Sequence, residues 1–211
     1  MLSPWILTAG RAVLALALGL VITFTSGHTA TLGLVAFGVF AVISGLLLLG
    51  AYIGRRAPVA ARTPFRAAGL VSVVAGIAAL VVPGGGIGYF VWVLSGWAIV
   101  TGALELVSGI RFRRTGVAWT DWITVGALTV ILGIVTLVIP PDISQPFSGE
   151  KGVEGLLTSP IILVGMLGAW AVITGVLQAI AAASPKRTGR DASRTTEPAP
   201  ASTASTGGAP K

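Results

Sequence analysis

The sequence predicts an all-α protein, a polytopic membrane bundle of six transmembrane helices built as three tandem two-helix repeats. Composition is the first of three observations behind this prediction. Of the 211 residues, 54% are hydrophobic and only 10% are charged, and the mean hydropathy is +0.92. In a typical soluble domain about a quarter of all residues are charged. The other two observations are the lengths of the apolar segments and an internal repeat.

Six apolar segments each have a length suited to a lipid bilayer. About 20 residues, rising 1.5 Å each in a helix, cross a hydrocarbon core of about 30 Å. Because lipid offers no hydrogen-bond partners to backbone groups, each segment must form a helix. In chain order the segments are Pro4–Phe24, Thr31–Gly54, Pro64–Val82, Ile87–Ile110, Thr120–Ile139 and Pro160–Ala183.

The ends of these segments carry recognisable signals. Three segments open with a hydroxyl residue followed by proline, which is typical of an N-cap and a first helical position. The loop after the fifth segment, from Pro141 to Ser159, is longer than its counterparts and carries acidic residues. The opening pairs are Ser3-Pro4, Thr63-Pro64 and Ser159-Pro160.

A unit of 57 residues recurs along the chain. It places Gly19 on Gly76 and Gly45 on Gly102, and an insertion delays the second helix of the third copy by 16 residues. The copies cover about 4–57, 63–114 and 119–183, so residues 1–183 form one six-helix membrane domain. Residues 184–211 are rich in Pro, Ala, Ser, Thr and Gly, which predicts a disordered, basic cytoplasmic tail.

Basic residues are concentrated on one predicted side of the membrane. Setting aside Arg11 and Lys211, eleven basic residues lie in alternate linkers and the tail, and the other linkers contain only Lys151. This asymmetry predicts that both termini are cytoplasmic. Since topology explains the pI of 11.1, no nucleic-acid partner is expected. The eleven are Arg55, Arg56, Arg62, Arg66, Arg111, Arg113, Arg114, Lys186, Arg187, Arg190 and Arg194.

The lipid bilayer is the one partner that the sequence predicts directly. Cations at the start of the tail can also contact anionic lipid, at about 1 kcal/mol each, although setting the topology is a sufficient reason for their presence. The sequence identifies no protein partner. The cations concerned are Lys186, Arg187, Arg190 and Arg194.

Small residues recur every seven positions within the helices, as at Gly69 and Gly76. Close backbone approach at such residues provides packing energy that lipid-embedded helices cannot obtain from the hydrophobic effect. We therefore expect helix packing at these glycines, with hinge motion as the alternative. The expected packing residues are Gly45, Gly76, Gly102, Gly133 and Gly175.

Two ionisable residues, Arg11 and Glu105, lie inside the apolar segments at a similar predicted depth. The favoured interpretation is that each side chain reaches the nearer interface separately. The alternative is an ion pair within the membrane, since an isolated charge there is costly. Leu48 and Gln178 occupy the positions equivalent to Glu105, so a threefold set of carboxylates is excluded.

No pattern in the chain predicts catalysis or a cofactor. There is no cysteine, no metal-ligand spacing, no phosphate-binding loop and no nucleophile elbow. The glycine run Gly84–Gly86 lies in a predicted external turn and is not expected to hold phosphate. We therefore expect a non-enzymatic protein without catalytic, metal-binding or cofactor-binding residues.

The recurring motifs resemble the HdeD-like family. They are Gly76 with Leu80-Val81-Val82-Pro83, Gly133 with Leu137-Val138-Ile139-Pro140, the blocks Ala41–Gly45, Ala98–Gly102 and Ala171–Gly175, and Arg11 early in the first segment. The resemblance covers about residues 5–183. It implies a six-span protein of the bacterial cytoplasmic (inner) membrane, built from a short repeat of unknown function and linked in some members to acid resistance.

The first expectation for function is therefore a non-enzymatic integral membrane protein with a role in acid or envelope stress tolerance. A small-solute or ion carrier or channel is the second. The third is a membrane scaffold that recruits partners through its external loop or its tail.

Overall fold

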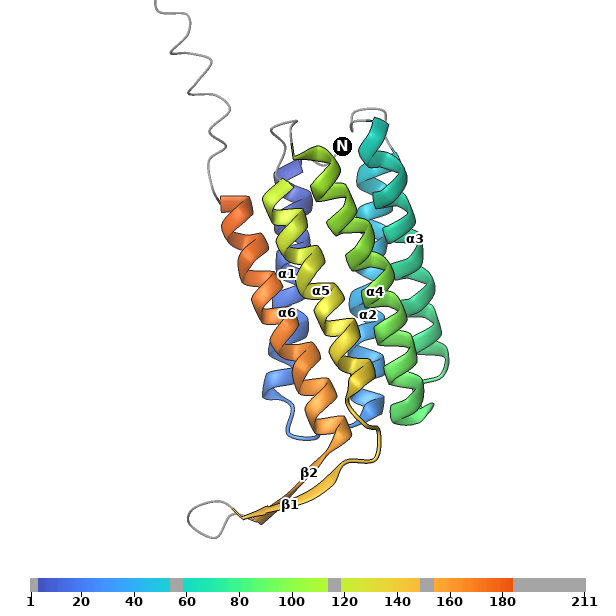
Figure 1. Cartoon of the computed structure of the whole chain (residues 1–211), viewed down its shortest axis with the longest axis vertical. Helices are drawn as coiled ribbons and strands as arrows, with labels where there is room; N and C mark the ends of the chain where they lie inside the picture. The colour runs from blue at the N-terminus through green and yellow to red at the C-terminus, as the bar shows by residue number, and fades with distance from the viewer. Residues whose placement is uncertain (1–3, 54–58, 114–118, 149–153, 184–211) are drawn as a thin grey trace, which may run out of the picture.

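The computed structural model describes residues 4–53, 59–113, 119–148 and 154–183. Over these ranges it contains six helices long and apolar enough to cross a membrane, which confirms the predicted class (Figure 1). Their bounds lie within two residues of the predicted segments, except at the start of α3. The helices are α1 (Pro4–Phe24), α2 (Ala30–Ile53), α3 (Val59–Val81), α4 (Gly86–Phe112), α5 (Trp119–Val138) and α6 (Ser159–Ala183).

One predicted helix start and one predicted N-cap are wrong. Helix α3 begins five residues before Pro64, so this proline lies inside the helix and removes one backbone N–H from its second turn. At the start of α6, the Ser159 hydroxyl does not act as a helix cap. It donates to the Pro140 carbonyl at 2.8 Å and accepts from the Ile143 N–H at 2.8 Å, which anchors the preceding loop.

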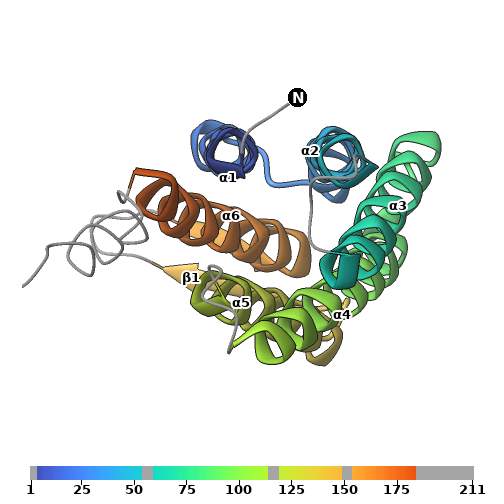
Figure 2. The same cartoon turned by 90° about the horizontal axis from the view of Figure 1, so that it is seen from above.

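The helices follow one another around a ring, with α6 packed against both α5 and α1 (Figure 2). The most extensive contacts join α2 with α3, α4 with α5, and α6 with α1. Two helices of one sequence copy contact each other less than helices of successive copies do. The predicted two-helix repeats are therefore not confirmed as the main packing units. The structural pair combines the second helix of one copy with the first helix of the next.

Glycines lie at each of these three seams between copies. A methyl group on Gly45 would lie 2.6 Å from the Gly69 carbonyl oxygen, and one on Gly102 would lie 2.8 Å from the Val130 nitrogen. Such distances are too short for a real carbon, so a larger residue would force the helices apart. The same holds at Gly76 against Gly38, at Gly133 against Ile99, and at Gly175 against Leu16.

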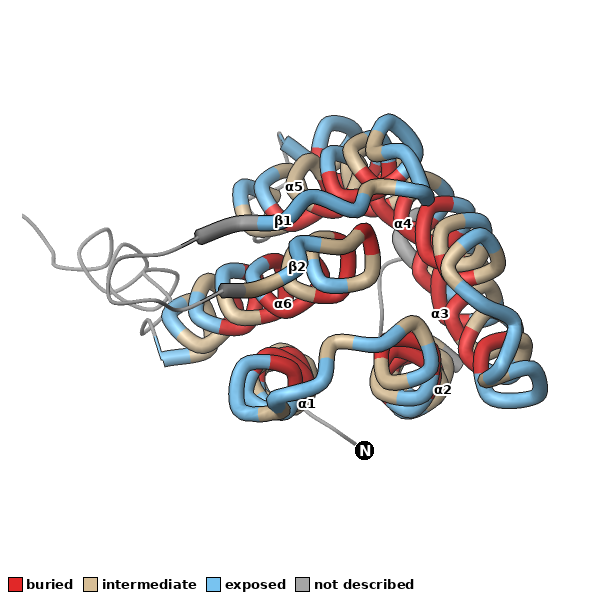
Figure 3. Tube along the Cα trace, turned by 90° about the horizontal axis from the view of Figure 1, so that it is seen from below, coloured by how far each residue is buried: buried red, intermediate tan, exposed pale blue. Residues whose placement is uncertain are grey.

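The outer surface of the ring is apolar, and the core lies at its centre (Figure 3). Leu20, Val74 and Ile180 are more than half exposed although their helices are fully formed. Such a surface is suited to lipid contact. Buried side chains, among them Phe37 and Phe90, face the interior.

A β-hairpin, which was not predicted from the sequence, occupies the long loop between α5 and α6. Strands β1 (Ser144–Ser148) and β2 (Glu154–Thr158) pair antiparallel and project from one end of the bundle (Figure 1). We call this the hairpin end. The opposite end, where α1 begins and α6 finishes, is called the terminal end. The terminal end is the one that the charge pattern predicts to be cytoplasmic.

The glycine seams lead to a first prediction. Gly45→Ala should destabilise the bundle by about 1–3 kcal/mol, because the added methyl group meets backbone atoms that cannot move independently. Gly50→Ala, in the same helix, meets nothing within 4 Å and should leave stability unchanged or raise it. Thermal unfolding in detergent measures both. Equal stability of the two variants would contradict the proposed role of the seam.

Candidate functional site

Three aromatic rings meet on the central axis of the ring of helices. Phe40 of α2, Trp97 of α4 and Trp170 of α6 occupy equivalent positions in the three sequence copies. Their centroids are 6.1 Å apart for Phe40 and Trp97, 5.9 Å for Phe40 and Trp170, and 5.5 Å for the two tryptophans. Each pair is edge-to-face, the arrangement that the ring quadrupole favours. We call these three residues the aromatic triad.

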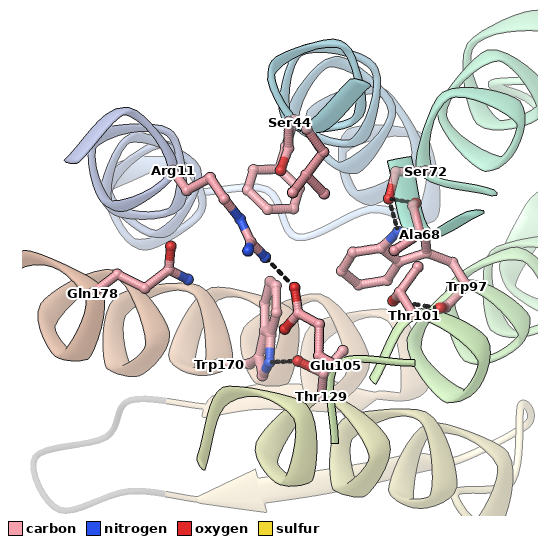
Figure 4. A pocket seen from close by; sticks show the side chains of 12 residues that line it. Arg11, Ser44, Ala68, Ser72, Trp97, Thr101, Glu105, Thr129, Trp170 and Gln178 are labelled. Carbon is pink, nitrogen blue, oxygen red and sulfur yellow. Dashed lines mark hydrogen bonds and ion pairs between the residues drawn. The ribbon is translucent and has the colours of Figure 1, made fainter. Parts of the chain in front are cut away.

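The two tryptophans of the triad are held by hydroxyl groups of their own copies. Trp97 Nε1 donates to Ser72 Oγ at 2.9 Å, and Trp170 Nε1 donates to Thr129 Oγ1 at 3.2 Å (Figure 4). Ser72 and Thr129 are themselves equivalent positions. In the first copy the corresponding residues are Phe40, whose ring has no N–H group, and Ala15, whose side chain has no hydroxyl group. Each buried indole N–H group is therefore bonded to a hydroxyl of its own copy.

Arg11 and Glu105 form a direct ion pair above the triad, on the side of the terminal end. Arg11 Nη2 lies 2.6 Å from Glu105 Oε1, and the side chains are 20% and 6% exposed (Figure 4). The pair links α1 to α4 across the axis. The favoured interpretation, in which each charge reaches the interface alone, does not describe this structure. The second interpretation does.

Gln178 of α6 contributes a third polar group to the same region. The residue is 8% exposed, and its Oε1 atom is buried without a hydrogen-bond partner in the part of the chain that the structure describes. Arg11, Glu105 and Gln178 come from the first, second and third copies respectively. Leu48, the equivalent of Glu105 in the first copy, is buried and apolar. One different polar side chain per copy therefore meets at one place.

These groups line a cavity on the axis. The space available to the centres of water molecules is about 20 Å³. The aromatic triad closes the cavity towards the hairpin end, where buried residues such as Phe37, Phe90 and Leu94 fill the core. The cavity is thus a blind pocket within the half of the bundle nearer the terminal end. It is not a continuous path.

The chemistry available in the described lining of the cavity is hydrogen bonding and charge. Its lining includes one carboxylate, one guanidinium, one amide and a few hydroxyl groups. Over the described residues no group of three or more His, Cys, Asp or Glu side chains could hold a metal ion. The hydroxyls of Ser72 and Thr101 already bond to backbone carbonyls, and no histidine or lysine is present to activate them.

The predicted residues fall in two places. Arg11 and Glu105 meet at the cavity, and the five predicted packing glycines lie at the seams between copies. The tail cations Lys186, Arg187, Arg190 and Arg194 lie outside the described residues. Sequence reasoning missed the aromatic triad and its hydroxyl partners. The signal was present, because Phe40 and Trp97, and likewise Ser72 and Thr129, are separated by the repeat length.

Fold and site together define a multi-pass membrane bundle with an internal repeat and an axial polar pocket. Residues 67–138, which run from α3 to the end of α5, match the family model described as a short repeat of unknown function (DUF308). No curated protein matches the chain significantly, and no solved structure does. The match agrees with the expected short membrane repeat. It does not single out the HdeD-like family.

The triad leads to a second prediction. Ser72→Ala should destabilise the protein by about 1–3 kcal/mol, because it leaves the buried Trp97 N–H without a partner. Adding Trp97→Phe removes that donor and reproduces the Phe40–Ala15 arrangement of the first copy. The double variant should therefore be no less stable than Trp97→Phe alone. A thermal double-mutant cycle measures this coupling, and purely additive effects would contradict it.

The ion pair leads to a third prediction. Glu105→Leu alone should destabilise the bundle by about 3–5 kcal/mol, because it leaves the Arg11 charge buried without compensation. Arg11→Leu combined with Glu105→Leu should recover most of that loss, since two apolar residues fill the same space. Arg111→Leu at the exposed end of α4 provides the control for removal of a cation. Unfolding midpoints of the wild type and these three variants measure the effect, and a mild effect of Glu105→Leu alone would contradict it.

Proposed function

We propose that this chain is a non-enzymatic integral membrane protein of the HdeD-like type that contributes to acid or envelope stress tolerance. In this proposal it lies in the bacterial inner membrane with both termini in the cytoplasm. The single observation that carries the proposal is the Arg11–Glu105 ion pair. It makes the contact between α1 and α4 depend on a pair of opposite charges inside the bundle.

The ion pair offers a physical link between charge and packing. Loss of the Glu105 charge would remove the partner of Arg11 and leave one charge without compensation inside the bundle. Tyr52 of α2 is a further titratable group within electrostatic range of both residues. The described lining residues of α3, α5 and α6 are not titratable. Loss of the pair would loosen α1 from α4, and a partner or the surrounding lipid could sense that change.

The residues that line the cavity support the non-enzymatic part of the proposal. Its one carboxylate is paired with a guanidinium, and the two indole N–H groups bond to hydroxyls. A hydrolase or transferase needs a nucleophile within reach of a base. The described lining supplies structural bonds instead.

A small-solute carrier is the second candidate, and the polar cavity on the axis favours it. Many carriers hold their substrate near the middle of a repeat-built bundle. In this bundle the triad and the apolar core would have to move before anything could cross. A scaffold is the third candidate. It is favoured by the β-hairpin, which carries the exposed Leu156 and Leu157 beyond the helices.

A deletion strain tests the proposed role directly. We expect reduced survival at low pH, restored by the wild-type chain but not by Glu105→Gln, which keeps the shape of the side chain and removes its charge. Glu154→Gln in the hairpin is the control for loss of a carboxylate and should restore survival. Undiminished survival of the deletion strain in acid would contradict the role.

Two further measurements distinguish the carrier and the scaffold from the proposed function. Solute or proton flux into proteoliposomes that Glu105→Gln abolishes would favour the carrier. Loss of the phenotype on deletion of residues 141–158, with the bundle still folded, would favour the scaffold.

A further inference from the structure

We propose that the axial cavity is a binding site for a compact, neutral molecule with hydrogen-bond donors, of the class that extends from water to small primary amides such as formamide and urea. The inference concerns binding only, and it does not depend on the proposed role in stress tolerance. It rests on the unpaired amide of Gln178, the charge balance of the cavity, its size and its asymmetry.

Gln178 requires a donor. Its Oε1 atom is buried without a partner over the described residues, although buried side-chain acceptors in proteins are nearly always hydrogen-bonded. The residue lines the cavity and extends from α6 on the side of Arg11 (Figure 4). Leaving such an oxygen unsatisfied costs free energy, whereas a donor in the cavity would satisfy it.

The ion pair completes the recognition pattern. The pair joins Nη2 of Arg11 to Oε1 of Glu105. A ligand can therefore donate to the other carboxylate oxygen of Glu105 and accept from another N–H of Arg11. A primary amide offers both functions in one small molecule. The cavity thus presents two acceptors and one donor to its occupant.

Charge balance favours a neutral occupant. The guanidinium of Arg11 and the carboxylate of Glu105 already neutralise each other. A charged ligand would bring an uncompensated charge into a region of low dielectric, which is costly within a membrane. Ammonium-type and carboxylate ligands are therefore disfavoured, and water and neutral amides are not.

The size of the cavity sets an upper limit on the size of the ligand. One water requires about 10–15 Å³ of space for its centre. The cavity provides about 20 Å³, which is between one and two times that amount, so only the smallest members of the proposed class can enter. The aromatic triad forms an apolar floor at the other side. A flat amide can lie against this floor while its polar edge faces Gln178.

The repeat shows that apolar side chains can occupy positions equivalent to those of the polar groups. At the position of Glu105 and Gln178 the first copy carries the buried Leu48, and at the position of Arg11 the second copy carries the buried Ala68. Apolar side chains thus fill equivalent places within the same bundle. The polar groups at the cavity are best explained by a polar occupant.

Access is expected on the side of α1. In the second and third copies Phe65 and Trp122 occupy equivalent positions at the terminal end, with centroids 4.7 Å apart. The first copy carries the smaller, half-buried Thr8 at this position. Arg11 is also more exposed than Glu105, which agrees with an opening beside α1.

The test uses the full chain in detergent with 5-fluorotryptophan, observed by fluorine NMR. Trp97→Phe and Trp170→Phe assign the two resonances at the cavity. Formamide and urea should shift both resonances saturably. Dimethylformamide, which has no N–H donor, and guanidinium, which is charged, should not. Gln178→Leu should weaken formamide binding by about threefold to tenfold, as expected for one lost hydrogen bond.

The control variant is Gln145→Leu, which makes the same chemical change on the exposed β1 strand and should bind formamide like the wild type. If Gln178→Leu fails to fold, Gln178→Met retains the length of the side chain and replaces it.

A second arm separates water from a solute. If formamide does not bind but water–protein NOEs reveal a long-lived water at the Gln178 side-chain amide, the site is supported with water as its ligand. Neither a solute nor a long-lived water at this place would overturn the inference. Equal shifts from dimethylformamide, or equal binding by Gln178→Leu and the wild type, would overturn it as well.

Discussion

The close approach of helix backbones at the three seams is the constraint on which the rest of the structure depends. Lipid gives the helices no hydrophobic reason to associate, so contact must come from surfaces that fit at short range. Gly45 against Gly69, and Gly102 against Gly126, provide such surfaces, because neither helix presents a side chain there. The seams join successive copies rather than the two helices of one copy. The chain closes on itself when α6 meets α1.

Closure of the ring gives the bundle a central axis, and the residues that face this axis form the candidate site. Once three equivalent helices face inwards, equivalent positions must meet, and large residues there fill the centre. Phe40, Trp97 and Trp170 do so with edge-to-face contacts. One layer nearer the terminal end, the chain departs from equivalence, and Arg11 meets Glu105. The frame is therefore nearly threefold while the chemistry is not.

Much of the fold could be predicted from the sequence, because segment length and hydropathy determine which parts cross the membrane. The glycine spacing also identified the contact residues. The pairing of helices could not be predicted, since a repeat defines which positions are equivalent but not which copies touch. The start of α3 before Pro64 was missed because proline is also tolerated inside a helix at the expense of one hydrogen bond. The Arg11–Glu105 contact depends on the ring geometry, which brings α1 opposite α4. The positions of these two residues in the sequence do not predict that contact.

Seam positions and axial positions of the repeat are under different constraints, which explains why a degenerate repeat can form a specific site. Positions at the seams must remain small in every copy, because backbone atoms of the neighbouring helix leave no room. Positions on the axis are less restricted, since they face a space that one large side chain from another copy can fill. Leu48, Glu105 and Gln178 show that a single axial position accepts an apolar, an acidic and an amide side chain. Three copies can therefore share one architecture and still supply three different groups to one pocket.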